Sequence, residues 1–298
     1  MDMVCFTKKV EKRLLLCAVA LLLCGAIGFG IYGSLQAAPA SAQPAEDASE
    51  KLPAVPILMY HSVCNNQRVH SEYRITPDTL ESDLAYLKEH GYTSIFVGDL
   101  VGYVYEGYAL PDKPVIITLD DGYLNNYTEV LPLLEKYDMK ATISVVGEFS
   151  ATFSDTPDRN PLYAYLTWSD IRELDNSGRI EIGNHTYAMH ELGTRRGCMK
   201  IENETEEKYD KALTEDLSKL QDALTQYSGL TPIVFTYPYG FVSEESIPVI
   251  KKLGFLAALT CYERINYITG DPEQLYRLGR FNRPAGITTE AFMQKIGV

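Results

Sequence analysis

Acidic and imidazole side chains come directly after short apolar runs at three places in this sequence. These side chains are His61 (after 55–60), Asp120 and Asp121 (after 115–119), and His185 and His190 (after 179–182). Two neutral imidazoles and one carboxylate form a ligand set that suits Zn²⁺ and leaves positions open for water and substrate. Where two acids are adjacent, one can bind the metal while the other accepts a proton from water. The pattern therefore indicates metal-dependent hydrolysis.

Each of these patterns also has a purely structural interpretation. An Asp-Asp-Gly sequence after a strand is often only a turn and a helix cap. His185 and His190 are five residues apart, unlike the i, i+4 pair of many zinc proteases, so only a bent loop brings both rings together. His70 and His90 follow no apolar run, and we expect them on the surface or in a helix cap.

The apolar runs alternate with amphipathic segments of helical spacing. Strand-like runs occur at 55–60, 92–97, 115–119, 141–146, 179–182, 233–237 and 255–259. Helical segments begin at Thr76 and cover 127–137, 169–176, 204–227 and 243–253. This alternation predicts parallel pairing. We expect an α/β fold, a distorted (β/α) barrel of about seven parallel strands, with the functional side chains at the carboxyl ends of the strands.

The first 53 residues differ in composition from the rest of the chain. Residues 1–13 hold four basic side chains and predict a cytoplasmic N-terminus. The apolar segment 14–34 is long enough for a transmembrane signal anchor, although the Ala-rich sequence after it leaves a cleaved signal peptide open. Residues 35–53 predict an Ala/Pro/Ser linker, and 54–298 a folded domain. We expect this domain outside the cytoplasm, on the cell membrane or secreted if the segment is cleaved.

The charge balance restricts the possible partners. Asp and Glu total 40 against 27 Lys and Arg, a net charge of −13, which repels phosphate backbones and excludes nucleic acid as a partner. Three cysteines, Cys64, Cys198 and Cys261, lie after residue 53 without a CxxC spacing. One disulfide is possible, but we expect these thiols to be mostly buried and inert.

Taken together, the motifs resemble those of the polysaccharide deacetylases with NodB homology, carbohydrate esterase family 4. The matching segments are Thr118-Leu119-Asp120-Asp121-Gly122, His185-Thr186 with His190, and Pro238-Tyr239-Gly240. The resemblance covers roughly 55–284. Two features depart from the usual pattern: Phe235 and Thr236 stand where most members have an arginine, and no histidine follows His190. Met59-Tyr60-His61 instead resembles the poly-N-acetylglucosamine deacetylase branch, whose barrel is circularly permuted.

The resemblance implies a role for each side chain. Asp121, His185 and His190 would hold one divalent cation, with Zn²⁺ as the expected ion. Asp120 would be the general base, His61 the general acid, and the backbone N–H of Tyr239 would help to bind the oxyanion. Arg280 or Arg283 would replace the missing guanidinium that orients the base, and a surface salt bridge is the alternative for either.

The implied substrate is an N-acetylated extracytoplasmic glycan, poly-N-acetylglucosamine or peptidoglycan, and the implied products are acetate and an amino sugar. O-acetyl esters would suit the same chemistry. Because two expected family residues are missing, a glycan-binding protein of the same fold with little or no activity remains an alternative. A phosphatase-like hydrolase with Mg²⁺ is a third function, which the two histidines disfavour because imidazole suits zinc better.

Overall fold

The computed structural model describes residues 52–65 and 72–298. The predicted basic N-terminus at 1–13, the apolar segment at 14–34 and all but the end of the 35–53 linker lie outside the described residues, as does His70. Within the described part, no helix combines the length and apolar character needed to cross a bilayer.

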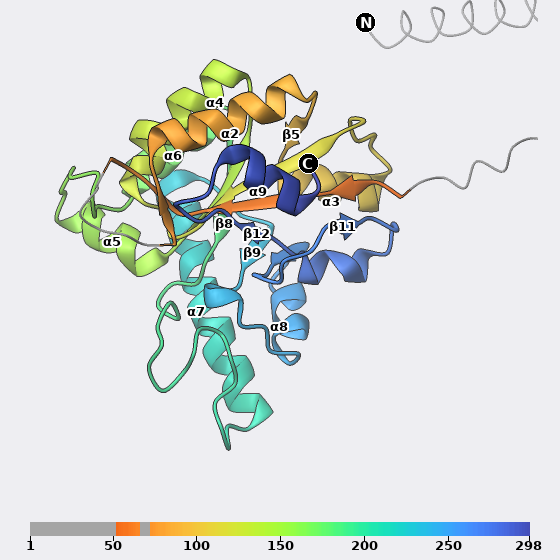
Figure 1. Ribbon diagram of the computed structural model, residues 1–298. Coiled ribbons are helices and arrows are strands. Elements are labelled where there is room, and N and C mark those ends of the chain that lie inside the picture. Colours follow the sequence, from red (N-terminus) through yellow and green to blue (C-terminus); the bar gives the residue numbers. More distant parts are fainter. Residues whose placement is uncertain (1–51, 66–71) are drawn as a thin grey trace, which may run out of the picture. The chain divides into compact units, whose positions relative to one another are not determined.

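A sheet of parallel strands forms the centre of the fold (Figure 1). Its strands are β2 (Ile57–Tyr60), β5 (Thr93–Ile95), β6 (Pro114–Leu119), β7 (Ala141–Val145), β8 (Ile180–Asn184), β9 (Val234–Thr236), β10 (Ala257–Leu259) and β12 (Phe281–Asn282). Seven of them follow the order β10-β9-β8-β7-β6-β2-β12, and β5 pairs with the first half of β6. All these pairings are parallel, as the alternation of strands and helices predicted.

The segment after η3 (Pro272–Arg277) connects the two ends of this curled sheet. Leu278 pairs with Leu259 of β10, and three residues later β12 pairs with Leu58 and Met59 of β2. The backbone N–H of Thr260 donates to the carbonyl of Leu278 at 2.9 Å. The prediction of a distorted (β/α) barrel is therefore confirmed, and its circular permutation stays a prediction.

Two short ladders lie beside the barrel. Strand β1 (Ala54–Val55) pairs antiparallel with β11 (Asn266–Tyr267). Strand β3 (Ser62–Val63) pairs in parallel with β4 (Arg74–Ile75) directly after His61. The second ladder fixes the backbone that leaves β2, and so the start of the loop that carries His61.

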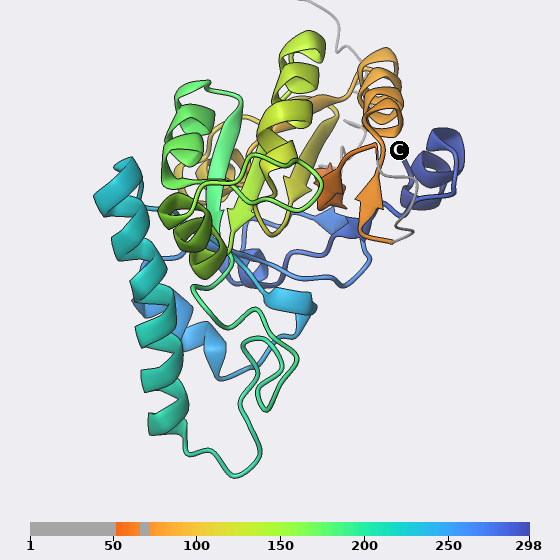
Figure 2. The same cartoon turned by 90° about the vertical axis from the view of Figure 1, so that its left-hand side faces the viewer.

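Helices surround the sheet. They are α2 (Pro77–Glu89), α3 (Val97–Glu106), α4 (Leu131–Tyr137), α5 (Gly147–Asp155), α6 (Trp168–Asn176), α7 (Glu206–Ser228), α8 (Ser246–Lys252) and α9 (Thr289–Ile296), with a π-helical turn η1 (Asn126–Val130) before α4 and a 3₁₀ turn η2 (Pro238–Gly240) after β9. Figure 1 shows α2, α4 and α6 on one side of the sheet, and Figure 2 shows α7 along another side of the barrel. Helices α3, α5 and α9 were not predicted from the sequence.

Alternate strand residues divide the core between the two faces of the sheet. Leu58, Ile117 and Ile143 belong to a buried cluster with residues of α2, α4 and α6. Ile57 and Ile116, which neighbour two of these in the sequence, belong instead to a cluster with residues of α3. A shift of one residue would exchange these faces, so the register is strongly fixed. The direction of the first side chain after each strand is fixed with it.

Candidate metal centre

The carboxyl ends of β2, β6 and β8, with the turn after β9, surround one cavity of about 600 Å³. Its lining includes the six residues expected to bind the metal or take part in catalysis, namely His61, Asp120, Asp121, His185, His190 and Tyr239. The backbone of β6 places the acids, because the N–H of Asp120 donates to the carbonyl of Tyr60 at 3.0 Å. Parallel strands bring their carboxyl ends to one edge, and there residues far apart in sequence meet.

Three of these residues form a possible metal site. Oδ1 of Asp121 lies 3.6 Å from Nε2 of His185 and 3.1 Å from Nε2 of His190. Ligands that each lie about 2 Å from a tetrahedral zinc ion are separated from one another by roughly 3–3.5 Å. Oδ1 of Asp121 is buried and has no hydrogen bond of ordinary geometry within the described residues, which is consistent with a ligand atom. The residues present therefore fit a zinc-like cation.

The backbone and the second ring nitrogen orient these ligands. Asp121 has a φ of 71°, in the left-handed region, so the backbone turns sharply two residues after the end of β6. Nδ1 of His185 lies 2.8 Å from the carbonyl oxygen of Thr236 and donates to it, which leaves Nε2 free to bind a metal. Nδ1 of His190 is held less firmly, 3.5 Å from the hydroxyl of Tyr239.

The carboxylate of Asp121 and the imidazoles beside it alter each other's protonation. Burial alone would raise the pKa of Asp121, but the imidazoles of His185 and His190 outweigh it and hold that pKa well below its usual value. Burial would lower the pKa of His190, and the carboxylate of Asp121 reverses this, so that the pKa of His190 is raised. Asp121 is therefore ionised at neutral pH, the state that metal binding requires.

Asp120 has a different partner from its neighbour. Nη1 and Nη2 of Arg280 donate to Oδ1 and Oδ2 of Asp120, both at 2.7 Å, and both side chains are buried. Arg280 is itself fixed through Nε, which donates to the carbonyl of Thr260 at 2.9 Å. Burial would raise the pKa of Asp120, but the guanidinium outweighs it and lowers that pKa. The acid is thus ionised and held in one orientation by a two-pronged hydrogen bond.

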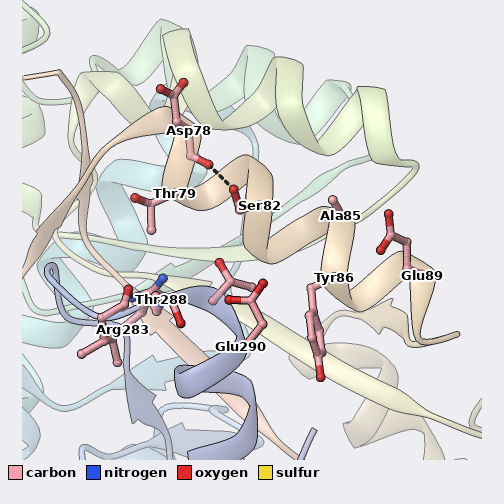
Figure 3. Close-up of a pocket in the computed structure, with 11 residues that line it drawn as sticks. Asp78, Thr79, Ser82, Ala85, Tyr86, Glu89, Arg283, Thr288 and Glu290 are labelled. Carbon is pink, nitrogen blue, oxygen red and sulfur yellow. Dashed lines mark hydrogen bonds between the residues drawn. The ribbon is translucent and has the colours of Figure 1, made fainter.

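Arg283, the other candidate for this position, lies elsewhere. Nε and Nη2 of Arg283 donate to the two carboxylate oxygens of Asp83, at 2.8 and 3.2 Å. Figure 3 shows Arg283 and Thr288, which caps α9, in a separate pocket beside α2. Arg283 therefore joins α2 to the C-terminal segment and does not orient Asp120. The alternative of a surface salt bridge is wrong for both arginines, because both are buried.

His61 lies beside Asp120 in the same cavity, with Nε2 of the ring 4.0 Å from Oδ2 of the acid. Burial is the main influence on the pKa of His61 and lowers it, against the attraction of Asp120 and Asp121. The ring packs against that of Tyr73, with 4.8 Å between centroids. The imidazole and the acid pair therefore line the same part of the cavity.

The asparagines that hold the His61 loop were missed in the sequence. Nδ2 of Asn126 donates to the carbonyl of His61 at 2.9 Å, and Oδ1 of Asn125 accepts from the N–H of Val63 at 2.9 Å. Both asparagines are fully buried where the π-helical turn η1 begins. Such turns often occur at functional sites. The one sequence feature that could have indicated them is the pair of adjacent asparagines a few residues after the acid pair.

Tyr239 adopts a left-handed backbone conformation, with a φ of 58°, inside the turn η2. Its ring lies over His190, with 4.7 Å between centroids, and is 38% exposed at the cavity. The tyrosine thus forms part of the wall next to the metal ligands. The role of its backbone N–H stays a prediction.

The remaining predicted residues take no part in the metal site. The three described cysteines carry free thiols; Cys64 and Cys198 are buried, and Cys261 is partly exposed at the cavity. His90 is the exposed cap of α2, where its Nδ1 lies 2.8 Å from the carbonyl of Tyr86, as the sequence indicated.

Comparisons with known proteins found relatives of this chain. The model of the polysaccharide deacetylase family matches residues 107–258. The chain is 25% identical over 221 residues to the poly-beta-1,6-N-acetyl-D-glucosamine N-deacetylase of Escherichia coli K12, a match that covers 66% of this chain and 32% of that protein. It is 26% identical to a putative polysaccharide deacetylase of Bacillus subtilis, over 82% of this chain and 76% of the relative.

A solved structure shows the same fold. The Streptococcus pyogenes deacetylase PplD, solved in complex with acetate, superposes with a TM-score of 0.67 at 21% identity, over 82% of this chain and 99% of that chain. The chain spans about a third of the length of the E. coli relative, so the likeness to that protein concerns one part of it. Because the family model matches half of the sequence and includes the acid pair and both histidines, this chain belongs to the polysaccharide deacetylase family.

Proposed function

We propose that this protein is a metal-dependent deacetylase that hydrolyses the N-acetyl groups of an extracytoplasmic glycan, poly-N-acetylglucosamine or peptidoglycan. The main support for the proposal is that the two adjacent acids have different partners. Asp121 faces two imidazoles, whereas Asp120, next to it, is held by Arg280 in the same cavity. One acid is thereby suited to bind a metal and the other to accept a proton.

Asp121, His185 and His190 would hold the cation, and Zn²⁺ suits this set of one oxygen and two nitrogen ligands. When bound, the cation supplies a water of lowered pKa and polarises the acetyl carbonyl. Asp120 takes the proton of the attacking water. Arg280 keeps Asp120 ionised and aimed at this proton, since its two hydrogen bonds hold both carboxylate oxygens in one orientation.

The other two residues act on the substrate. The tetrahedral oxyanion that forms on the acetyl carbon accepts a hydrogen bond from the backbone N–H of Tyr239. His61 donates a proton to the departing nitrogen from its imidazolium form, which the carboxylates of Asp120 and Asp121 favour against burial. Acetate and a free amino sugar then leave. His61 and Asp120 lie side by side on the wall of one cavity, 4.0 Å apart, so both can reach the same bound acetamide.

The substrate class and the location rest on the relatives and the N-terminal sequence. Curated relatives from E. coli and Staphylococcus aureus are named poly-beta-1,6-N-acetyl-D-glucosamine N-deacetylases. The basic residues at 1–13 followed by the apolar segment 14–34 support a membrane anchor with the catalytic domain outside the cytoplasm. A glycan polymer outside the cell is the substrate that fits both.

The proposal is tested by measuring acetate release from poly-N-acetylglucosamine and from peptidoglycan, with and without a chelator and with Zn²⁺ restored afterwards. We expect release that the chelator stops and Zn²⁺ recovers. A phosphate ester assayed in parallel should not be hydrolysed. Bound zinc without acetate release from either glycan would contradict the proposal and favour the glycan-binding alternative.

A further inference from the structure

The chain between the two proposed histidine ligands has a strained conformation. Thr186 follows His185 and is fully buried with a φ of 73°. For a β-branched residue this left-handed region is strained, and it persists only where surrounding contacts enforce it. Oδ1 of Asn184, which accepts from the N–H of Thr186 at 2.9 Å, is one of these contacts.

Helix α5 holds the carbonyl side of this loop. The N–H of Gly147 donates to the carbonyl of Thr186 at 3.0 Å, and that of Glu148 donates to the carbonyl of Tyr187 at 2.8 Å. The approach is so close that a Cβ at Gly147 would lie 2.5 Å from the Tyr187 ring. The loop therefore cannot move toward α5.

A carboxylate from helix α7 holds the other side. Oδ1 of Asp216 accepts from the N–H of Tyr187 at 2.7 Å, and Oδ2 accepts from the N–H of Ala188 at 2.9 Å. Burial raises the pKa of Asp216, and these two N–H groups oppose that rise because they stabilise the ionised carboxylate. Lys219, one helical turn further along α7, places Nζ 3.7 Å from the centroid of the Tyr187 ring. The loop is thus clamped between two helices.

The two histidines depend on this clamp to different degrees. His185 is buried, and its Nδ1 is fixed by the carbonyl of Thr236 at 2.8 Å. His190 lies two residues after Ala188, and its Nδ1 is 3.5 Å from the nearest hydroxyl, that of Tyr239. Apart from the packing of its ring against Tyr239 and Phe149, the position of His190 depends on the backbone that Asp216 holds.

We propose that Asp216 is a positioning residue for the metal centre, which keeps His190 within binding distance of the ion shared with Asp121 and His185. The inference rests on the proposed function, because it takes these three residues as the metal ligands. Outer partners that fix a ligand in this way typically contribute 10–100-fold to metal affinity. Asp216 itself does not touch the metal or the substrate.

The test compares Asp216→Asn and Asp216→Ala with the wild type and with Asp210→Asn, an exposed carboxylate on the same helix. The full-length protein is stripped of metal, and its affinity for Zn²⁺ is measured by competition with a chromophoric chelator. We expect both Asp216 variants to bind Zn²⁺ roughly 10–100-fold more weakly, and Asp210→Asn to bind as the wild type does. The visible spectrum of the Co²⁺-loaded protein should lose intensity in the same two variants.

Melting temperatures of the metal-free proteins separate positioning from a general loss of stability. If the alanine variant does not fold, Asp216→Asn carries the test, because it keeps the side-chain shape and one acceptor. Unchanged zinc affinity in Asp216→Asn, or an equal loss in Asp210→Asn, would overturn the proposal. A wild-type protein that binds zinc but releases no acetate would contradict the proposed function alone and leave this comparison valid.

Discussion

Arg280 holds both carboxylate oxygens of Asp120 at 2.7 Å, although the two residues are 160 positions apart in the sequence. The arginine comes from the segment that connects β10 to β2, so the contact that orients the proposed base is also part of the closure of the barrel. The contact between Arg280 and Asp120 therefore requires the C-terminal segment to be in place.

Substitution of this arginine should lower activity more than stability alone explains. In Arg280→Lys the charge remains, but the two-pronged hydrogen bond is lost and Asp120 can turn. We expect acetate release to fall about 10²-fold, since small misplacements of a catalytic group have effects of this size. Arg283→Lys is the matched control, because it weakens the buried pair with Asp83 and should lower the unfolding midpoint while the folded protein keeps its activity. Equal activity losses in both variants would count against a specific role for Arg280.

Asp120→Asn should separate metal binding from proton transfer. The amide cannot accept the water proton, so we expect acetate release to fall roughly 10²–10⁴-fold. Because Asp120 is not among the three ligands, zinc content measured by elemental analysis should stay at the wild-type value. Full activity in this variant would show that the roles of Asp120 and its neighbour are wrongly assigned.

His61→Ala should affect substrates according to their leaving group. An amine needs a proton to depart, so we expect deacetylation of the glycan to fall roughly 10²–10⁴-fold. An activated aryl acetate leaves as a stable anion without a proton, and its hydrolysis should change little. If both substrates slow equally, His61 acts on a step other than protonation of the leaving group.

Zinc should stabilise the protein through the histidines of the proposed site. A ligand at 100 times its dissociation constant adds about 2.7 kcal/mol to the free energy of unfolding. We expect the melting temperature of the metal-free wild type to rise when Zn²⁺ is added, and that of His185→Ala to stay constant. His90→Ala, an exposed histidine on a helix cap, should respond as the wild type does. A zinc response in His185→Ala would place the ion elsewhere.

Glu181 should make the stability depend on pH. Burial raises the pKa of Glu181 to about 7, although the hydroxyl of Thr142 and the backbone N–H groups of Val97 and Gly98 donate to its carboxylate. The folded state therefore binds a proton that the unfolded state has already released between the ordinary glutamate value and pH 7. The contribution of Glu181 to the free energy of unfolding falls as pH rises through this window and is smaller at pH 8 than at pH 5.

The measurement is chemical unfolding at pH 5 and pH 8 in the wild type and in Glu181→Gln. We expect the wild type to lose more stability between the two values than the glutamine variant, which keeps the size and one acceptor but does not titrate. The same difference in both proteins would mean that the pKa of Glu181 is not raised in the folded state.

The sequence alone determined the strands of the central sheet except β12, and the edge at which their next side chains lie. Runs such as 115–119 and 141–146 are apolar over strand length, and their alternation with amphipathic segments leaves parallel pairing as the consistent arrangement. The residue after each run is then fixed at one edge of the sheet, which predicted that Asp120, Asp121 and His185 lie near each other, as they do around the cavity. The local pattern of apolar residues was enough to predict this arrangement, because burial determines the register of a strand and which face each side chain points to.

Only the tertiary structure decided which arginine meets the base and how the histidine loop is held. Arg280 and Arg283 differ by three positions in one short segment, and nothing local distinguishes them; the pairing of Leu278 with β10 and of β12 with β2 turns one inward and the other toward Asp83. Asp216 is likewise one carboxylate among several on α7. The partners of Asp216 depend on how α7 packs against the rest of the core. That packing depends on contacts between distant segments, so no single segment of the sequence predicts it.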